Sequence, residues 1–127
     1  MNFIIGQLLM HCNATLSFWL FVEMMYDVRD IYQNDLPGLI KHSYIIRLLI
    51  MKHIPEVHET FNAHDIKPVQ YASGFIFSIF MNVLPEDKTK ISNAFFTLFF
   101  RHKWEFFYKL VLTVINHIKD KILMHDN

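Results

Sequence analysis

The stretch WEFFYKLVLTVINHIKDKIL, residues 104–123, carries the clearest structural signal in this 127-residue chain. Its apolar stripe has spacings of four, three, four and four residues: Phe107, Val111, Val114, Ile118 and Ile122. Polar side chains populate the other side: Glu105, Lys109, Asn116 and Asp120. Because an α-helix has about 3.6 residues per turn, this spacing places the apolar residues on one face. The stretch therefore predicts an amphipathic helix with a wide apolar face.

Helical spacing continues from this stretch toward the N-terminus. We expect further helices over residues 3–12, 14–26, 36–54, 56–64, 69–84 and 90–100. Breaks separate them: a polar turn at 27–37, prolines at 55, 68 and 85, and a bend at 101–103. No segment shows convincing β alternation, and no linker marks a domain boundary. The sequence predicts an all-α fold of six to eight helices, with residues 1–127 forming one helical domain or lobe.

Two of the expected helices carry an apolar stripe that we expect to pack against neighbouring helices. In residues 36–54 the stripe has four members: Ile40, Tyr44, Leu48 and Met51. In residues 14–26 it is shorter: Phe18, Phe21 or Val22, and Met25. Both spacings follow the helical repeat.

Composition excludes several protein classes. Twelve Lys and Arg balance twelve Asp and Glu, so the chain has no electrostatic footprint for nucleic acid. The single Cys12 excludes a disulfide framework. The chain is also too aromatic to be disordered. With 13 Phe and only 19% charged residues, however, it is unusually apolar for a small soluble monomer.

Two stretches, residues 1–22 and 68–85, contain no Asp, Glu, Lys or Arg. Each approaches the roughly 20 residues that a bilayer-spanning helix needs. Polar side chains interrupt both, among them Asn13 in the first and Gln70 in the second. Such side chains weaken partition into lipid, which favours buried core helices. A small integral membrane protein that spans the bilayer with these stretches is the least favoured reading of the chain.

No catalytic or metal-binding pattern emerges from the sequence. Three histidines follow one another at spacings of five and six residues: His53, His58 and His64. A metal site on a helix usually has its ligands one turn apart, which these spacings do not give. Glu56 and Glu59 share a helix face, but the sequence offers nothing to bury them. We expect no metal, no cofactor and no catalytic residue.

Seven segments of the chain resemble successive sequence motifs of one domain family, and they occur in the same order as in that family. They are Met1–Leu9, Ser17–Phe21, Asp35–Leu39, Ile54–Val57, Gly74–Phe80 with Leu84–Pro85, Ile91–Phe96, and Phe107–Leu112. The family is the TBC domain, the all-helical domain of Rab GTPase-activating proteins. The first segment resembles the part of its Tyr-x-Gln-Gly-Met-Asn motif that starts with Met-Asn. The second resembles its Ala-Phe-Trp-x-Phe helix. The resemblance is to the C-terminal portion of the domain.

That resemblance implies a part in stimulating GTP hydrolysis by Rab GTPases. Family members use two fingers: an arginine in Ile-x-x-Asp-x-x-Arg and the glutamine of Tyr-x-Gln. The arginine offsets charge on the transferring phosphoryl group and the glutamine positions the attacking water. Neither motif occurs in these 127 residues. The resemblance places both fingers in sequence upstream of Met1, so we expect the chain alone to be inactive as a GTPase activator.

The resemblance also implies a partner and a location. The partner is a GTP-bound Rab-family GTPase, met in the cytoplasm and at the periphery of endomembranes. Asn2, beside the position of the missing glutamine, is the candidate partner-binding residue. The alternative is a non-catalytic TBC-like module that binds a GTPase or serves as an adaptor. In either case we expect an exposed apolar patch near the N-terminal helix, because a lobe of a larger domain leaves apolar surface uncovered.

Overall fold

The computed structural model describes residues 2–79 and 89–124, and the side chains of 4–79 and 90–124. Seven α-helices and one short 3₁₀ helix fill these residues: α1 (Asn2–His11), α2 (Ala14–Val28), η1 (Arg29–Ile31), α3 (Pro37–His53), α4 (Pro55–Ala63), α5 (Pro68–Ser78), α6 (Thr89–His117) and α7 (Lys119–Met124). The described residues contain no β-strand. The all-α expectation is confirmed. The expected loop at 85–88 and the last residues of the helix expected over 69–84 lie outside the described residues.

Local chemistry sets most of the helix ends. Asn13 caps α2, its side-chain oxygen accepting a hydrogen bond from the Leu16 N–H at 2.8 Å. Helices α3, α4 and α5 each begin with proline, which suits the first helical position because the N–H it lacks would have no helical partner there. These signals are readable in the sequence, so the expected helix starts lie within a few residues of the observed ones. The helix expected over 69–84 ends earlier, at Ser78, because Ile79 adopts left-handed backbone with φ 48°.

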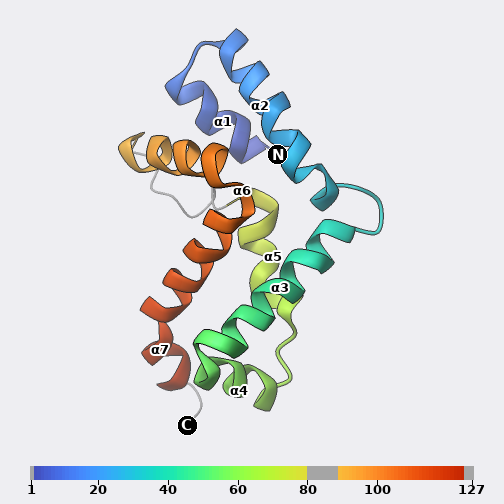
Figure 1. Ribbon diagram of the computed structural model, residues 1–127, viewed down its shortest axis with the longest axis vertical. Helices are drawn as coiled ribbons and strands as arrows, with labels where there is room; N and C mark the ends of the chain where they lie inside the picture. The colour runs from blue at the N-terminus through green and yellow to red at the C-terminus, as the bar shows by residue number, and fades with distance from the viewer. Residues whose placement is uncertain (1, 80–88, 125–127) are drawn as a thin grey trace.

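The helices form an elongated array (Figure 1). Helices α1 and α2 pack together at one end, and α4 and α7 pack together at the other. Helix α3 runs between the ends and packs on α4, α5 and α6. The core lies between these helices, and its largest fully buried side chains include Phe99, Phe107 and Met24.

Helix α6 bends at Lys103, where the backbone adopts φ 56° and ψ −137°. Two contacts with Asp27, at the end of α2, hold this bend. The Lys103 Nζ lies 2.8 Å from the Asp27 Oδ2, and the Trp104 Nε1–H donates to the Asp27 carbonyl oxygen at 2.9 Å. The bend expected at residues 101–103 is confirmed, and it lets the two arms of α6 pack against different helices.

The helix expected over 104–123 is interrupted after His117, and α7 starts at Lys119. This break changes the expected stripe. Phe107 and Val111 are buried as expected, but Ile118 lies at the break and is exposed. Ile115, four residues after Val111, is buried instead. The buried line before the break therefore follows an i, i+4, i+8 row.

The expected buried stripe of α3 is wrong. All four of its residues, Ile40, Tyr44, Leu48 and Met51, are exposed. The buried face holds Leu39, His42, Ser43, Ile46 and Ile50. Hydropathy favoured the first set because the second contains a histidine and a serine. Helices α5 and α6 pack on the second face, and this packing decides which stripe is buried.

The uncharged stretches do not form long apolar helices. The first is divided at Cys12–Asn13 into α1 and α2, which pack side by side. Within the described residues, no helix combines the length and the apolar character required to cross a membrane.

Candidate functional site

The α1–α2 hairpin is the part of the molecule where the candidate partner-binding residue lies. The Ser17 hydroxyl donates to the Cys12 carbonyl oxygen at 3.4 Å, which steadies the turn between the helices. At the end of α1, the His11 Nε2 and the Ser92 Oγ share a hydrogen bond of 2.6 Å. This bond ties the hairpin to the first arm of α6. The hairpin is thus held firmly enough to present one defined surface.

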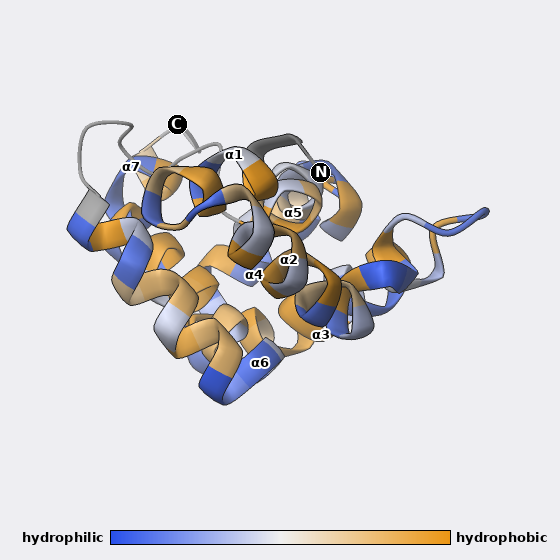
Figure 2. Cartoon of the chain, turned by 90° about the horizontal axis from the view of Figure 1, so that it is seen from above, coloured by the Kyte–Doolittle hydropathy of each residue, from blue (hydrophilic) through white to orange (hydrophobic). Residues whose placement is uncertain are grey.

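The outward side of α2 is apolar. A groove of about 300 Å³ runs along it, lined by Phe18, Phe21, Val22, Met25, Tyr26 and Arg29. Phe18 is 53% exposed and Trp19 is 61% exposed. Their rings meet edge to face with centroids 5.2 Å apart. Figure 2, viewed from the α1–α2 end, shows hydrophobic residues along both helices.

The stripe expected for residues 14–26 therefore lines an open groove. The buried residues of α2 are Ser17, Met24 and Val28, on a neighbouring face. Phe21 and Met25 are half-buried and pack against the core, as expected for the stripe, whereas Phe18 is exposed, which the expectation did not include. The structure also confirms the expected exposed apolar patch near the N-terminal helix, since Leu9, Met10 and Leu16 are exposed there as well.

Asn2 is the first residue of α1. The position of its side chain lies outside the described residues, so its contact with a partner stays a prediction. The structure places it in the same hairpin as the apolar groove of α2.

A buried polar cluster joins η1, α3 and the second arm of α6. His42 on α3 is 2% exposed and stacks on Trp104, with ring centroids 3.6 Å apart. Its Nδ1 lies 2.5 Å from the Tyr108 hydroxyl, and its Nε2 lies 4.0 Å from the Asp30 Oδ1. Nδ1 and the Tyr108 hydroxyl share a hydrogen bond, whereas among the described residues His42 Nε2 and Asp30 Oδ1 are buried without a hydrogen-bond partner.

Burial keeps the imidazole of His42 uncharged near neutral pH. Desolvation, with a smaller contribution from the positive charge of Lys41, lowers the pKa of His42 to about 4, against the opposing effect of Asp30. Burial also raises the pKa of Tyr108 to about 12. Hydropathy patterns did not indicate this cluster.

The other residues singled out by the sequence lie apart from one another. Glu56 pairs with Lys119 of α7 at 3.3 Å, while His58 shares a hydrogen bond of 3.0 Å with Asn62. Cys12 is half-buried at the end of α1. Within residues 4–79 and 90–124, no three His, Cys, Asp or Glu side chains gather closely enough to hold a metal ion.

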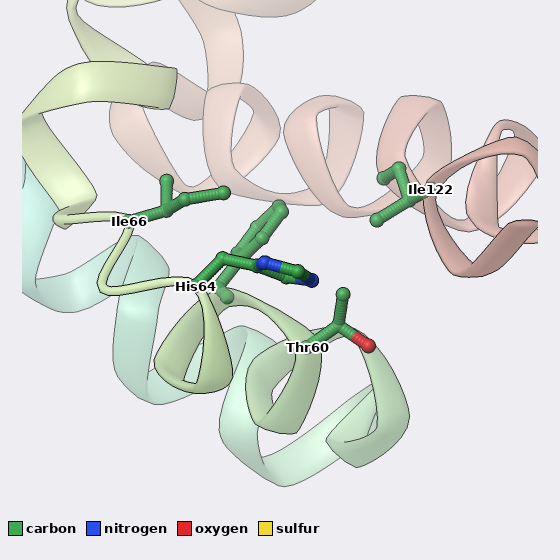
Figure 3. A pocket seen from close by; sticks show the side chains of 5 residues that line it. Thr60, His64, Ile66 and Ile122 are labelled. Carbon is green, nitrogen blue, oxygen red and sulfur yellow. The ribbon is translucent and has the colours of Figure 1, made fainter. Parts of the chain in front are cut away.

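A second concave surface lies at the opposite end, between α4 and α7. It has a volume of about 520 Å³ and is lined by Thr60, Phe61, His64, Ile66 and Ile122. Figure 3 shows His64 and Thr60 of the α4 region facing Ile122 across the pocket. Sequence patterns did not indicate this pocket, because its walls come from segments nearly 60 residues apart.

Comparison with known proteins identifies a family. The Rab-GTPase-TBC domain family matches residues 1–123. Ecotropic viral integration site 5 protein homolog from Homo sapiens is 25% identical over 126 residues, covering 98% of this chain and 15% of that protein. GTPase activating protein Gyp51 from Schizosaccharomyces pombe is 24% identical over 125 residues, covering 97% of this chain and 12% of that protein.

A third relative, Rab GTPase-activating protein eat-17 from Caenorhabditis elegans, is 22% identical over 126 residues, 98% of this chain and 14% of that protein. No solved structure matches the chain. The chain spans only about 15% of the length of the first of these relatives. The family match covers helices α1 to α6 and all of α7 except Met124, and these helices agree with the all-helical architecture that the motif series implies. The chain therefore belongs to the Rab-GTPase-TBC domain family.

Proposed function

We propose that this chain is part of a Rab GTPase-activating protein and acts in membrane traffic. One observation carries the proposal: the family match extends over residues 1–123, with the motif-like segments in family order. Two of the relatives are named as GTPase-activating proteins. In this proposal residues 1–127 form one helical lobe that supplies a scaffold and part of the GTPase-facing surface.

The two finger motifs are absent from the 127 residues. Catalysis by the family needs an arginine against the phosphoryl charge and a glutamine on the water. In this proposal the chain supports the GTPase-facing surface of a regulatory protein. By itself it leaves the rate of GTP hydrolysis by the GTPase at its intrinsic value. Its place in the cell is the cytoplasm, peripheral to endomembranes through its GTP-bound partner.

The test measures phosphate release from a panel of GTP-loaded Rab GTPases, with and without an excess of the chain. We expect equal rates. Stimulation of any Rab would overturn the assignment of the missing fingers. A parallel pull-down compares GTP-loaded with GDP-loaded Rabs, and preference for the GTP form supports the proposed partner.

Asn2 is the residue to vary in that pull-down. We expect Asn2→Ala to weaken capture of the GTP-loaded Rab, because Asn2 adjoins the family's glutamine position. Asn93→Ala is the matched control, since Asn93 is exposed on the first arm of α6. Equal weakening by both variants would contradict a specific role for Asn2.

The second candidate is a non-catalytic interaction module, and the apolar groove of α2 favours it. Contiguous exposed apolar surface marks interaction sites in soluble proteins. Sedimentation velocity of the chain tests this surface. We expect self-association that falls in the double variant Phe18→Ser, Tyr26→Ser, with thermal stability nearly unchanged, because both side chains line the groove and are exposed. If no Rab binds in either nucleotide state and the wild-type chain stays monomeric, both candidates are wrong.

A further inference from the structure

A small polar pocket lies where the end of α4 and the start of α5 meet the middle of α3. Its volume is about 310 Å³, and its lining includes Tyr44 and Arg47 of α3, Asn62 of α4, and Asp65 and Lys67 of the connecting turn. It is distinct from the larger apolar pocket in Figure 3, although Ile66 lines both. A volume near 300 Å³ is at the lower end of the range of small-molecule sites.

The guanidinium of Arg47 is the unusual group in this pocket. Arg47 is half-buried, yet among the described residues no carboxylate lies within ion-pair distance of it. Five lysines of the described chain do have acidic partners: Lys41, Lys67, Lys103, Lys109 and Lys119. No nitrogen of Arg47 is among the buried, unpartnered atoms of the described residues, so the guanidinium remains accessible from the pocket. A guanidinium that has no carboxylate partner can pair with an anion that enters the pocket.

The turn that forms one wall is fixed before any ligand arrives. The Ile66 N–H donates to the Phe61 carbonyl oxygen at 2.8 Å, and the Asp65 N–H donates to the Asn62 carbonyl oxygen at 3.1 Å. With Asp65 at φ 54°, these bonds form the Schellman motif that ends α4. The Lys67 N–H donates to the Gln70 Oε1 at 2.6 Å, which fixes the start of α5. A preformed wall reduces the ordering cost of binding.

The functional groups around the pocket are mostly hydrogen-bond donors. Arg47 offers a planar fork, Lys67 an ammonium group, Asn62 an amide and Tyr44 a phenolic hydroxyl. The single carboxylate of the lining, Asp65, points to solvent with 84% of its side chain exposed and pairs with Lys67. Two cations and one carboxylate leave a net charge of +1 on the lining.

We propose that this pocket binds an oxyanion, a carboxylate or phosphate group, with the guanidinium of Arg47 as its main contact. Arginine pairs with both groups through two parallel hydrogen bonds. The proposed site is independent of the Rab-GTPase proposal, because it needs neither the finger motifs nor the α1–α2 hairpin.

The experiment titrates the ¹⁵N-labelled chain with inorganic phosphate and, separately, with acetate, against sodium chloride at matched ionic strength. We expect saturable shifts of the amide signals of residues 44–47 and 62–70, without equal shifts in α1 and α2. Phosphate alone, acetate alone or both producing these shifts identifies the source of the oxyanion. If neither shifts these signals beyond chloride, the proposal is wrong.

Two variants test the named contact. Arg47→Gln should raise the dissociation constant at least tenfold, whereas Arg101→Gln, which removes an exposed arginine of α6, should leave it unchanged. Asp65→Asn should bind the anion several-fold more tightly, because it removes the carboxylate that competes for Lys67. Asparagine tolerates the left-handed backbone at this position. A gain of affinity cannot result from misfolding, so unchanged or weaker binding in Asp65→Asn, or normal binding in Arg47→Gln, would overturn the assignment.

Discussion

Both faces of α3 carry isoleucine, but the two faces have opposite surroundings. Ile46 is 1% exposed and Ile40 is 60% exposed, although both lie on the same helix. The inner face also buries His42 and Ser43, while the outer face exposes Tyr44 and other apolar side chains. A row of apolar side chains therefore lies in solvent, while the buried face includes two polar residues. The contrast shows that the positions of α5 and α6, rather than the hydropathy of the stripe, select the buried face.

The largest expected effect is a loss of stability when a buried isoleucine of α3 is replaced, and an exposed isoleucine of the same helix gives the comparison. Ile46→Ala should lower the free energy of unfolding by about 2–5 kcal/mol, because it removes buried methyl groups and leaves a cavity. Ile40→Ala should change it by about 0.5 kcal/mol or less, as expected for an exposed position. Urea denaturation followed by circular dichroism measures both. Equal losses would mean that the outer face of α3 is covered in solution.

The second effect concerns the polar part of the inner face. Burial lowers the pKa of His42 to about 4, against 6.5 for an ordinary histidine. Between these pH values the unfolded chain binds a proton that the folded chain does not. The contribution of neutral His42 to the free energy of unfolding is therefore fully present above pH 6.5 and is lost as the pH falls toward 4. The loss should be at most about 3.5 kcal/mol, at about 1.4 kcal/mol per pKa unit.

Chemical denaturation at a series of pH values, for the wild type and His42→Gln, measures this contribution. The difference between the two profiles should narrow as the pH falls from 6.5 to 4. Asp30, Lys41 and Tyr108 surround His42 and remain in both proteins. Parallel profiles would show that His42 does not carry the pH dependence.

The smallest effect concerns the start of α3, where Gly38 lies against η1. A Cβ atom at Gly38 would lie 2.6 Å from the Asp30 carbonyl carbon and the Ile31 nitrogen, which are backbone atoms. Gly38→Ala should therefore destabilise the fold by about 1–3 kcal/mol, the usual cost of overpacking.

Gly74 of α5 provides the matched control. A Cβ atom added there would meet no atom within 4 Å beyond its chain neighbours and its own helix backbone. Gly74→Ala should therefore stabilise the helix by about 0.5–1 kcal/mol. Thermal unfolding of the two variants should move in opposite directions. A stabilising Gly38→Ala would show that α3 and η1 are further apart than this structure places them.

Sequence patterns predicted the elements better than the packing. The helix starts near Pro37, Pro55 and Pro68 and the bend near Lys103 all followed from local chemistry. The cap at Asn13 was not predicted, although its residue type suits that position. The break after His117 did not, because the stretch around it keeps its helical spacing. Of the candidate site, the exposed apolar patch near α1 was expected, whereas its position on the Phe18 side of α2 was not.

The two pockets and the buried histidine cluster illustrate why the remainder could not be predicted. Each joins residues far apart in sequence, as His42 and Tyr108 do across 66 positions. No local pattern records such a juxtaposition. Arg47 resembles any surface arginine in sequence. Arg29 and Arg101 also lack a carboxylate partner, but they are exposed, whereas Arg47 is half-buried beside a pocket.

The amino-acid sequence by itself determined the helical fold class, most helix boundaries and the family resemblance, because spacing, capping residues and prolines act over a few residues. Only the tertiary structure decided which faces are buried, where α2 leaves apolar surface open and which polar groups meet. The physical reason is that burial depends on neighbouring helices. Ile40 and Ile46 have the same hydropathy, and only the packing of α5 and α6 on α3 separates their surroundings.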